Sequence, residues 1–278
     1  MYKPLICLFF VLSSRADAQY YYNDILGNIQ AKENFLLFKK NNIKKVTVTT
    51  TDPDGMATEG FAIQQEINAS RNEMTTSTMS AMSSTSILAT AYLQGGYPSS
   101  TKDSTESSVS LTSYSYTDQT PQTLIKISST THEPGMGVVK YSEQRLYSFG
   151  SQQPTAMLRI KNGKDSLKVQ FIAEEHGWIG EERWIQKGKV IESYFYYYDA
   201  AGRLTDIGRF NRVAKKILPD YTFDYDDQGN MIGMNAFVTG TSQYRTWRYT
   251  YDARGLKTRE IIFNKYKQVE GKVIYNYQ

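Results

Sequence analysis

The chain has 278 residues and a formal net charge of +4 at pH 7, with 22 Tyr but only 2 His and 1 Cys. So few His and Cys side chains all but exclude tetrahedral zinc sites, disulfide frameworks and catalytic triads that depend on them. The charges are nearly balanced and scattered, which argues against nucleic-acid binding, and without its tyrosines the chain is poorer in apolar residues than ordinary globular domains.

Residues 1–18 have the three-part layout of a secretory signal peptide. Lys3 precedes an apolar run over residues 5–12, and a stretch of small residues ends at Ala18. The run is much shorter than the roughly 20 residues of a membrane-spanning helix. We therefore expect cleavage between Ala18 and Gln19. The mature chain should be exported, to the periplasm, the cell surface or the medium, with no transmembrane segment after signal removal.

Residues 19–45 form a second segment with a different composition. Apolar residues recur from Ile25 to Phe38, and Lys39 and Lys40 follow, as is typical of the C-terminal end of a helix. We predict one or two short helices that cap the open first edge of the sheet that follows, because repeat proteins need such caps. A helix that binds a partner is the alternative.

Residues 46–164 show degenerate repeats. The sequence Asp-Pro-Asp-Gly at residues 52–55 suits a type I turn, in which Asp52 accepts backbone hydrogen bonds and Gly55 tolerates a positive φ. Residues 75–90 and 99–117 are rich in Ser and Thr. We predict that they form polar, weakly packed strands, with mobile loops as the alternative.

Residues 165–278 contain clear repeats. The pattern aromatic-x-Tyr-Asp-x-x-Gly occurs three times, with its Tyr-Asp pairs 27 and 26 residues apart. Asp at the first turn position and Gly at the fourth are typical of a turn between antiparallel strands. A second turn signal, at residues 186–189, 218–220, 238–241 and 269–272, makes each unit a β-hairpin. The repeated turn residues are Tyr198, Asp199, Gly202, Tyr225, Asp226, Gly229, Tyr251, Asp252 and Gly255.

The Tyr-Asp pairs resemble the YD repeat of the RHS and teneurin-like families, over about residues 190–278. The resemblance implies long, coiling antiparallel sheets, which in some members shelter a C-terminal toxin or bind carbohydrate. We expect a small exported relative without a toxin domain. The predicted fold is all-β: repeated antiparallel hairpins over residues 46–278 that form an elongated, twisted or coiling sheet, with a short N-terminal helical cap.

Alternation along the strands places aromatic side chains on one face of this sheet. The candidate binding residues on that face are Tyr196, Phe223, Trp247, Tyr249 and Tyr275. Cross-strand aromatic pairs stabilise a sheet by about 0.2–1 kcal/mol each, so the stripe can be purely structural. Tyr also suits glycan or peptide binding, because it combines an apolar ring with a hydroxyl group.

The remaining candidates for chemistry are carboxylates. The Asp residues of the repeats are explained as turn formers; calcium binding there is the alternative, although each turn supplies few oxygens. Glu174 and Glu175 with His176, and Glu181 and Glu182 shortly after, form the one cluster reminiscent of acid–base chemistry. We interpret it as a solvated hairpin tip. No catalytic residue, metal or cofactor is expected.

The sequence thus predicts an exported, non-enzymatic β-repeat protein. It would act as a structural or interaction module at the cell envelope or outside the cell, with an unknown protein or glycan as its partner. A carbohydrate-binding module that uses the Tyr-rich face is the first alternative. A polysaccharide or cell-wall hydrolase that uses Glu174 or Glu175 is the second.

Overall fold

The computed structural model describes residues 20–278 apart from 81–82, 119–122, 134, 136–138 and 151–152. The predicted signal peptide and its cleavage site lie outside the described residues. In the described chain one helix, α1 (Tyr22–Lys40), precedes 18 strands. The strands are β1 (Lys45–Thr51), β2 (Ala62–Asn68), β3 (Glu73–Ser80), β4 (Ser83–Tyr92), β5 (Pro98–Ser104), β6 (Val109–Tyr116), β7 (Leu124–His132), β8 (Val139–Phe149), β9 (Pro154–Lys161), β10 (Asp165–Ala173), β11 (Ile179–Gln186), β12 (Lys189–Tyr198), β13 (Leu204–Asn211), β14 (Lys216–Tyr225), β15 (Met231–Phe237), β16 (Tyr244–Tyr251), β17 (Lys257–Asn264) and β18 (Val269–Tyr277).

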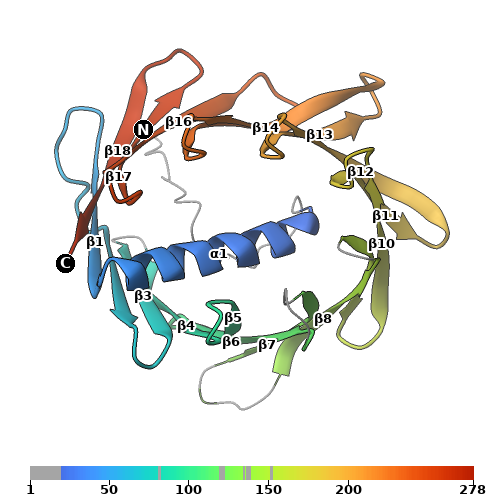
Figure 1. Ribbon diagram of the computed structural model, residues 1–278, viewed down its shortest axis with the longest axis horizontal. Helices are drawn as coiled ribbons and strands as arrows, with labels where there is room; N and C mark the ends of the chain where they lie inside the picture. Colours follow the sequence, from blue (N-terminus) through green and yellow to red (C-terminus); the bar gives the residue numbers. More distant parts are fainter. Residues whose placement is uncertain (1–19, 81–82, 119–122, 134, 136–138, 151–152) are drawn as a thin grey trace.

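The strands form one closed, up-and-down antiparallel barrel (Figure 1). Each strand pairs with its neighbours in sequence, and β1 pairs with β18, so that Val46 lies opposite Tyr277 and Thr51 opposite Lys272. The prediction of antiparallel hairpins after an N-terminal helix is confirmed. The prediction of an open, elongated sheet is wrong, because pairing of the first and last strands leaves no free edge.

Successive turns lie at opposite ends of the barrel. The three repeated Asp turns, at residues 199–203, 226–230 and 252–256, each follow an even-numbered strand and share one end, which we call the Asp-turn end. The turn at Asp52 follows β1 and lies at the other end of the barrel. We call this end, where the turns after the odd-numbered strands lie, the hairpin end. In the Asp52 turn, Gly55 has a φ of 88°, and the Gly55 N–H donates to the Asp52 carbonyl at 2.9 Å. The Asp52 turn therefore shares the form of the repeated turns but not their position.

Two of the four turns predicted from the second turn signal of each repeat are wrong. Residues 218–220 lie within β14, and residues 269–272 lie within β18. The chain reverses before them, where Lys215 and Lys267 adopt positive φ angles of 52° and 61° without a glycine. Pro219 sits opposite Gly208 next to a register shift, a position at which a strand tolerates proline.

The Ser- and Thr-rich segments form strands β3–β6, as predicted. Hydroxyl groups pair across the inner face between β6 and β7: Thr112 with Ser129 at 2.8 Å and Ser110 with Thr131 at 2.9 Å. These cross-strand bonds help to hold β6 in the wall, where few apolar contacts are available.

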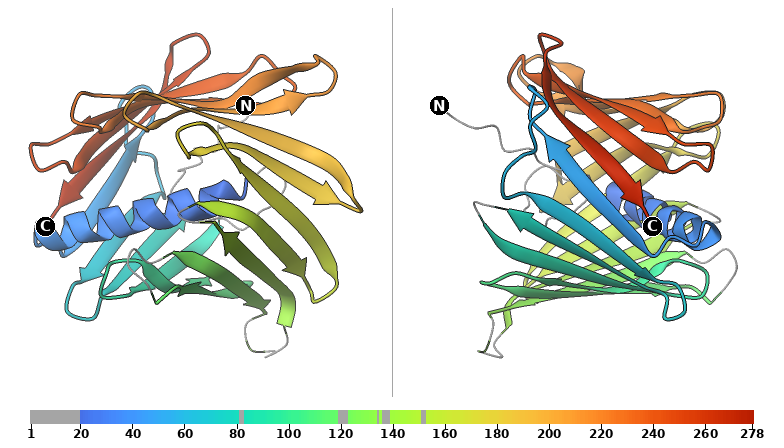
Figure 2. Two further views of the ribbon diagram at one scale, coloured as in Figure 1. Left: turned by 45° about the vertical axis from the view of Figure 1, so that its right-hand side comes forward. Right: turned by 90° about the vertical axis from the view of Figure 1, so that its left-hand side faces the viewer.

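Helix α1 lies inside the barrel, near the Asp-turn end (Figures 1 and 2). The Lys32 Nζ is 4.1 Å from the centre of the Tyr97 ring, in the turn after β4, and Lys39 donates to the Asn72 Oδ1 at 2.8 Å, in the turn after β2. The prediction of a cap over a sheet edge is wrong, because the barrel has no edge and one 19-residue helix crosses it. In the described chain no helix has the length and apolar character needed to cross a membrane.

The two faces of the barrel wall differ in polarity. In β1, Val46 and Val48 face inward and are buried, whereas Thr47 and Thr49, which alternate with them, face outward. Lipid-embedded barrels have the reverse order, with an apolar outside and a polar inside. Here exposed apolar side chains such as Ile87, Leu111 and Ile274 share the outer face with charged ones. The outward-facing charged residues are Lys102, Lys126, Lys168, Arg183, Asp206, Asp224, Arg248 and Lys272.

Candidate functional site

The aromatic face identified in the sequence is the inner wall of the barrel. Tyr196 of β12 is buried there, and the rings of Tyr20 and Tyr22 lie 5.8 Å and 5.2 Å from its ring in edge-to-face geometry. Phe223 stacks on Tyr221 of the same strand, with 6.3 Å between ring centres. The aromatic stripe predicted from the sequence thus continues along the inside of the wall.

The inner wall carries three apolar clusters of different make-up. The first joins Tyr20, Tyr21 and Tyr22 at the start of α1 to strands β6–β14, and the second joins Phe35 and Phe38 to the seam where β1 meets β18. The third consists of strand residues alone, all on β14–β17: Met234, Trp247 and Ile262, with Tyr221, Phe223, Met231, Ala236 and Tyr249 packed against them. We call this third cluster the luminal wall.

Glu182 of β11 anchors the beginning of α1. Its carboxylate accepts hydrogen bonds from the backbone N–H groups of Tyr21 (2.7 Å) and Tyr22 (2.9 Å), from the Trp184 Nε1 (2.5 Å) and from the Tyr196 hydroxyl (2.7 Å). The helix has no N-cap side chain of its own. Glu182 therefore satisfies the free N–H groups and the positive end of the helix dipole from across the barrel.

Glu182 is completely buried, and this burial raises its pKa above the ordinary value, although the four donors act in the opposite direction. Sequence reasoning missed this role, because it assigned Glu182 to a solvated hairpin tip. The structure corrects that assignment: Glu182 lies within β11 opposite Phe171. The signal that could have found it is the alternation Glu182-Trp184, which places the carboxylate on the aromatic face.

A charged network fixes the first turn of α1 beside Glu182. Asp24 forms an ion pair with Arg145 (2.5 Å) and accepts a short hydrogen bond from the Tyr147 hydroxyl. Arg145 also pairs with Glu143 (2.6 Å), and Arg159 donates to the Tyr21 hydroxyl at 2.7 Å. Burial by itself would lower the pKa of Arg145. The adjacent carboxylates of Asp24 and Glu143 together outweigh this effect and raise the pKa above its ordinary value, so the guanidinium stays charged.

A polar group borders the luminal wall on β17 and β18. The buried Glu260 carboxylate accepts from the Tyr275 hydroxyl at 2.5 Å and from the Lys257 Nζ at 3.0 Å. The same ammonium group lies 4.4 Å from the centre of the Tyr249 ring. An aromatic surface with a carboxylate, an ammonium and hydroxyl groups at its border can contact an apolar face of a ligand and bond its polar edge.

The repeated Asp residues are engaged within their own turns. In each turn one carboxylate oxygen accepts the N–H groups two and four residues later; for Asp226 these distances are 3.0 Å to Gln228 and 2.8 Å to Asn230. The second oxygen of Asp226 accepts from the Asn230 side chain at 2.9 Å. The described residues contain no group of three or more His, Cys, Asp or Glu side chains placed to hold a metal ion.

Glu174 and His176 lie at the turn between β10 and β11. The His176 Nδ1 is 2.9 Å from Glu174, and the hydrogen bond raises the pKa of His176 and lowers that of Glu174. The backbone N–H of His176 also donates to the Glu174 carboxylate at 2.8 Å. The pair closes its own turn at the Asp-turn end.

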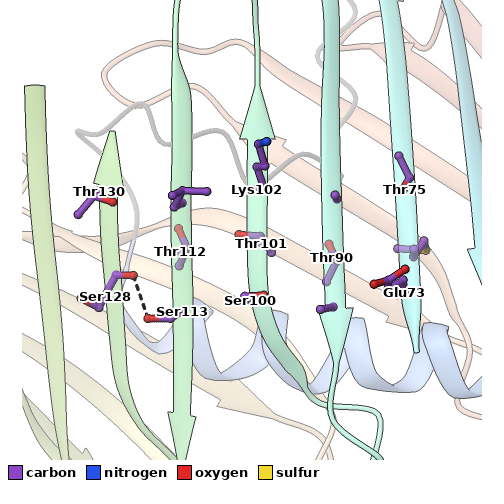
Figure 3. A pocket seen from close by; sticks show the side chains of 14 residues that line it. Glu73, Thr75, Thr90, Ser100, Thr101, Lys102, Thr112, Ser113, Ser128 and Thr130 are labelled. Carbon is purple, nitrogen blue, oxygen red and sulfur yellow. Dashed lines mark hydrogen bonds between the residues drawn. The ribbon is translucent and has the colours of Figure 1, made fainter. Parts of the chain in front are cut away.

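The outer face of β3–β7 carries a shallow open groove of about 640 Å³ (Figure 3). Small side chains such as Ala89, Ser100 and Ser113 make up its floor, with Glu73 and Lys102 among the larger ones. Because the groove lies on the outer face, the thickness of the sheet separates it from the aromatic side chains of the inner wall.

No family model matches the chain, and a search of curated proteins also finds no match. Among solved structures, the chain is similar to a porin-like protein from Bacteroides uniformis ATCC 8492, with 9% identity, a TM-score of 0.42 and coverage of 85% of this chain and 96% of that one. A porin-like protein from Bacteroides vulgatus ATCC 8482 follows, with 12% identity, a TM-score of 0.32 and coverage of 85% and 98%. The Photorhabdus luminescens Tc holotoxin pore matches with 11% identity and a TM-score of 0.30 over 86% of this chain and 17% of that one. Likenesses this distant assign neither a family nor a function.

Proposed function

We propose that the protein is an exported, non-catalytic interaction module that holds a ligand inside its barrel, against the luminal wall and the adjoining β18. The supporting observation is the make-up of the three clusters. Two of them include residues of α1 or of the segment just before it, whereas the residues of the third all lie on strands, and two of these, Tyr221 and Phe223, are shared with the first cluster. A ligand would contact the partly buried rings of this wall, Phe223 and Tyr249.

The chemistry of the wall favours carbohydrate as the ligand class. Trp247 is buried in the wall and Tyr249 beside it is partly buried, and aromatic rings of this kind suit the apolar faces of sugar rings. Glu260, Lys257 and the Tyr275 hydroxyl at the border suit sugar hydroxyl groups. The Tyr-rich face predicted from sequence would then act from inside the barrel.

The test is a titration of the full mature chain with soluble glucan, xylan and chitin oligosaccharides, followed by calorimetry. We expect Trp247→Ala to weaken binding by about 5- to 150-fold, since loss of an aromatic ring that contacts the ligand costs on the order of 1–3 kcal/mol. Arg248→Ala is the matched control, because Arg248 is the next residue of β16 and faces outward. It should bind as the unaltered protein does.

Three results would contradict the proposal. If none of the oligosaccharides binds, the carbohydrate assignment fails. If Trp247→Ala lowers only the melting temperature and leaves binding unchanged, the wall is merely core. Turnover of a polysaccharide that vanishes in Glu175→Gln would contradict the non-catalytic assignment.

A further inference from the structure

Four neighbouring tips at the hairpin end form a basic surface, on the arc of the barrel from β11 to β18. They are residues 186–191, 211–217, 238–243 and 265–268, which we call the basic rim. The rim contains no Asp or Glu, and its basic residues are Lys187, Lys189, Arg212, Lys215, Lys216, Lys265 and Lys267. In Figure 1 the hairpins of this arc flare outward from the barrel.

The rim also exposes large apolar side chains at its tips. Val213 is 95% exposed and Tyr266 is 70% exposed, and Val190 and Val238 are about half exposed. Single exposed apolar residues are common on protein surfaces, but here each of the four tips carries one. Val190, Val213 and Tyr266 are each next to a Lys or Arg in sequence, and Val238 lies on a tip without charged residues. Apolar tips flanked by Lys and Arg are typical of surfaces that enter the headgroup region of a membrane.

Three rim lysines occupy a backbone conformation that disfavours them. Lys187, Lys215 and Lys267 have φ angles of 49°, 52° and 61°, a region that Gly and Asn adopt at lower cost. The neighbouring tip after β9 uses Asn162 and Gly163 at this place, with φ angles of 47° and 69°. The recurrence of lysine at three strained positions indicates that the positive charge at the tip matters.

Two of the four tips are joined by a hydrogen bond. Arg212, in the tip after β13, donates to the Ile191 carbonyl at 2.7 Å, in the tip after β11. The opposite arc of the same end has the contrary charge, with Asp52, Asp54 and Glu59 after β1 and Glu106 after β5. The hairpin end therefore has one basic, apolar side and one acidic side.

We propose that the basic rim docks the barrel onto an anionic lipid surface. Lys and Arg side chains are attracted to anionic headgroups, while Val213, Tyr266 and their apolar neighbours enter the interface. The acidic arc would tilt away from the surface, and the charged outer wall would stay in water. This inference is independent of the luminal ligand, since no rim residue belongs to the luminal wall.

The experiment is co-sedimentation of the full mature chain with vesicles of phosphatidylcholine, with and without about a third of phosphatidylglycerol. We expect binding to the anionic vesicles only, weakened when NaCl is raised from about 0.1 M to about 0.5 M. The triple variant Lys187→Asn, Lys215→Asn, Lys267→Asn should lose on the order of 100-fold in partitioning. It should keep its melting temperature, because Asn suits a positive φ.

The control removes the same charge from the outer wall: Lys102→Gln, Lys126→Gln, Lys168→Gln. It should partition nearly as the unaltered protein does, whereas Val213→Ser should weaken binding to the anionic vesicles. Equal loss in the two triple variants would overturn the inference, because net charge alone would explain it. Absence of vesicle binding, with or without concentration-dependent self-association of the chain, would also overturn it.

Discussion

At the scale of single residues, Glu182 decides how α1 is placed. A carboxylate withdrawn from water is unfavourable by itself, and it is tolerated here because four donors surround it. Removing an acceptor would leave buried N–H groups of Tyr21 and Tyr22 without a partner, which costs about 1–3 kcal/mol. Glu182 thus links the start of α1 to the inner wall through one side chain.

We predict that Glu182→Gln lowers the free energy of unfolding by about 1–3 kcal/mol, because the amide NH2 of Gln would face donors at one of the two oxygen positions. Urea unfolding followed by near-ultraviolet circular dichroism measures this effect. Glu181→Gln is the control, since Glu181 pairs with Arg183 outside the lumen. If the Glu182→Gln protein is as stable as the unaltered one, the four hydrogen bonds make no net contribution to the free energy of unfolding.

The same variant has a defined pH dependence. The folded-state pKa of Glu182 is raised above its unfolded value of 4.5, so the folded chain binds this proton more tightly. The contribution of Glu182 to stability is therefore full below that value and is lost as pH rises through the folded pKa. The stability difference between the unaltered protein and Glu182→Gln should be larger at pH 4.5 than at neutral pH. A larger difference at neutral pH would mean that the hydrogen bonds outweigh burial.

At the scale of elements, the Asp turns set the hairpins that build the wall. Leu256 occupies the place of Arg203 and Asn230, yet its N–H donates to Asp252 at 3.0 Å, as those residues donate to their own Asp. Tyr251 pairs with Lys257 as Tyr198 pairs with Leu204. The register of the hairpin is thus held by backbone bonds to Asp and not by the side chain that follows Gly.

Two turn glycines form a matched pair for a stability measurement. Gly202 and Gly229 have φ angles of 78° and 87°, so replacement by Ala costs about 1–2 kcal/mol at either site. A Cβ at Gly229 meets nothing within 4 Å, whereas one at Gly202 would lie 2.6 Å from a ring carbon of Trp178. We expect Gly202→Ala to cost about 1–3 kcal/mol more than Gly229→Ala. Equal melting temperatures would show that the Trp178 ring moves aside freely.

At the scale of the whole molecule, closure of the barrel depends on α1. Phe35 is almost fully buried and stacks on Tyr92 at 3.9 Å, in the cluster that contains Val46 of β1 and Val273 of β18. The two strands of the seam come from opposite ends of the strand region. Their pairing therefore closes a long loop, which costs conformational entropy and favours slow folding.

We predict that Phe35→Ala lowers the free energy of unfolding by about 3–5 kcal/mol and loosens the seam first. Hydrogen exchange should show faster exchange in β1, β2 and β18, with β9–β13 protected, because those strands belong to the other cluster at the start of α1. Ile29→Ala is the control, since Ile29 lies on the same helix and is 41% exposed. Uniform loss of protection in all strands would show that the barrel unfolds as one unit.

The sequence by itself determined the hairpin repeat, the aromatic side of the strands and the presence of an N-terminal helix. These follow from local rules: Asp and Gly at turns, alternation along a strand, and apolar spacing along a helix. Only the tertiary structure decided that the sheet closes, that most tyrosines of the described strands face an inner wall, and that Glu182 is buried. Closure depends on pairing between β1 and β18, which lie more than 200 residues apart. No local pattern encodes such a pairing, because either strand could equally have remained an edge.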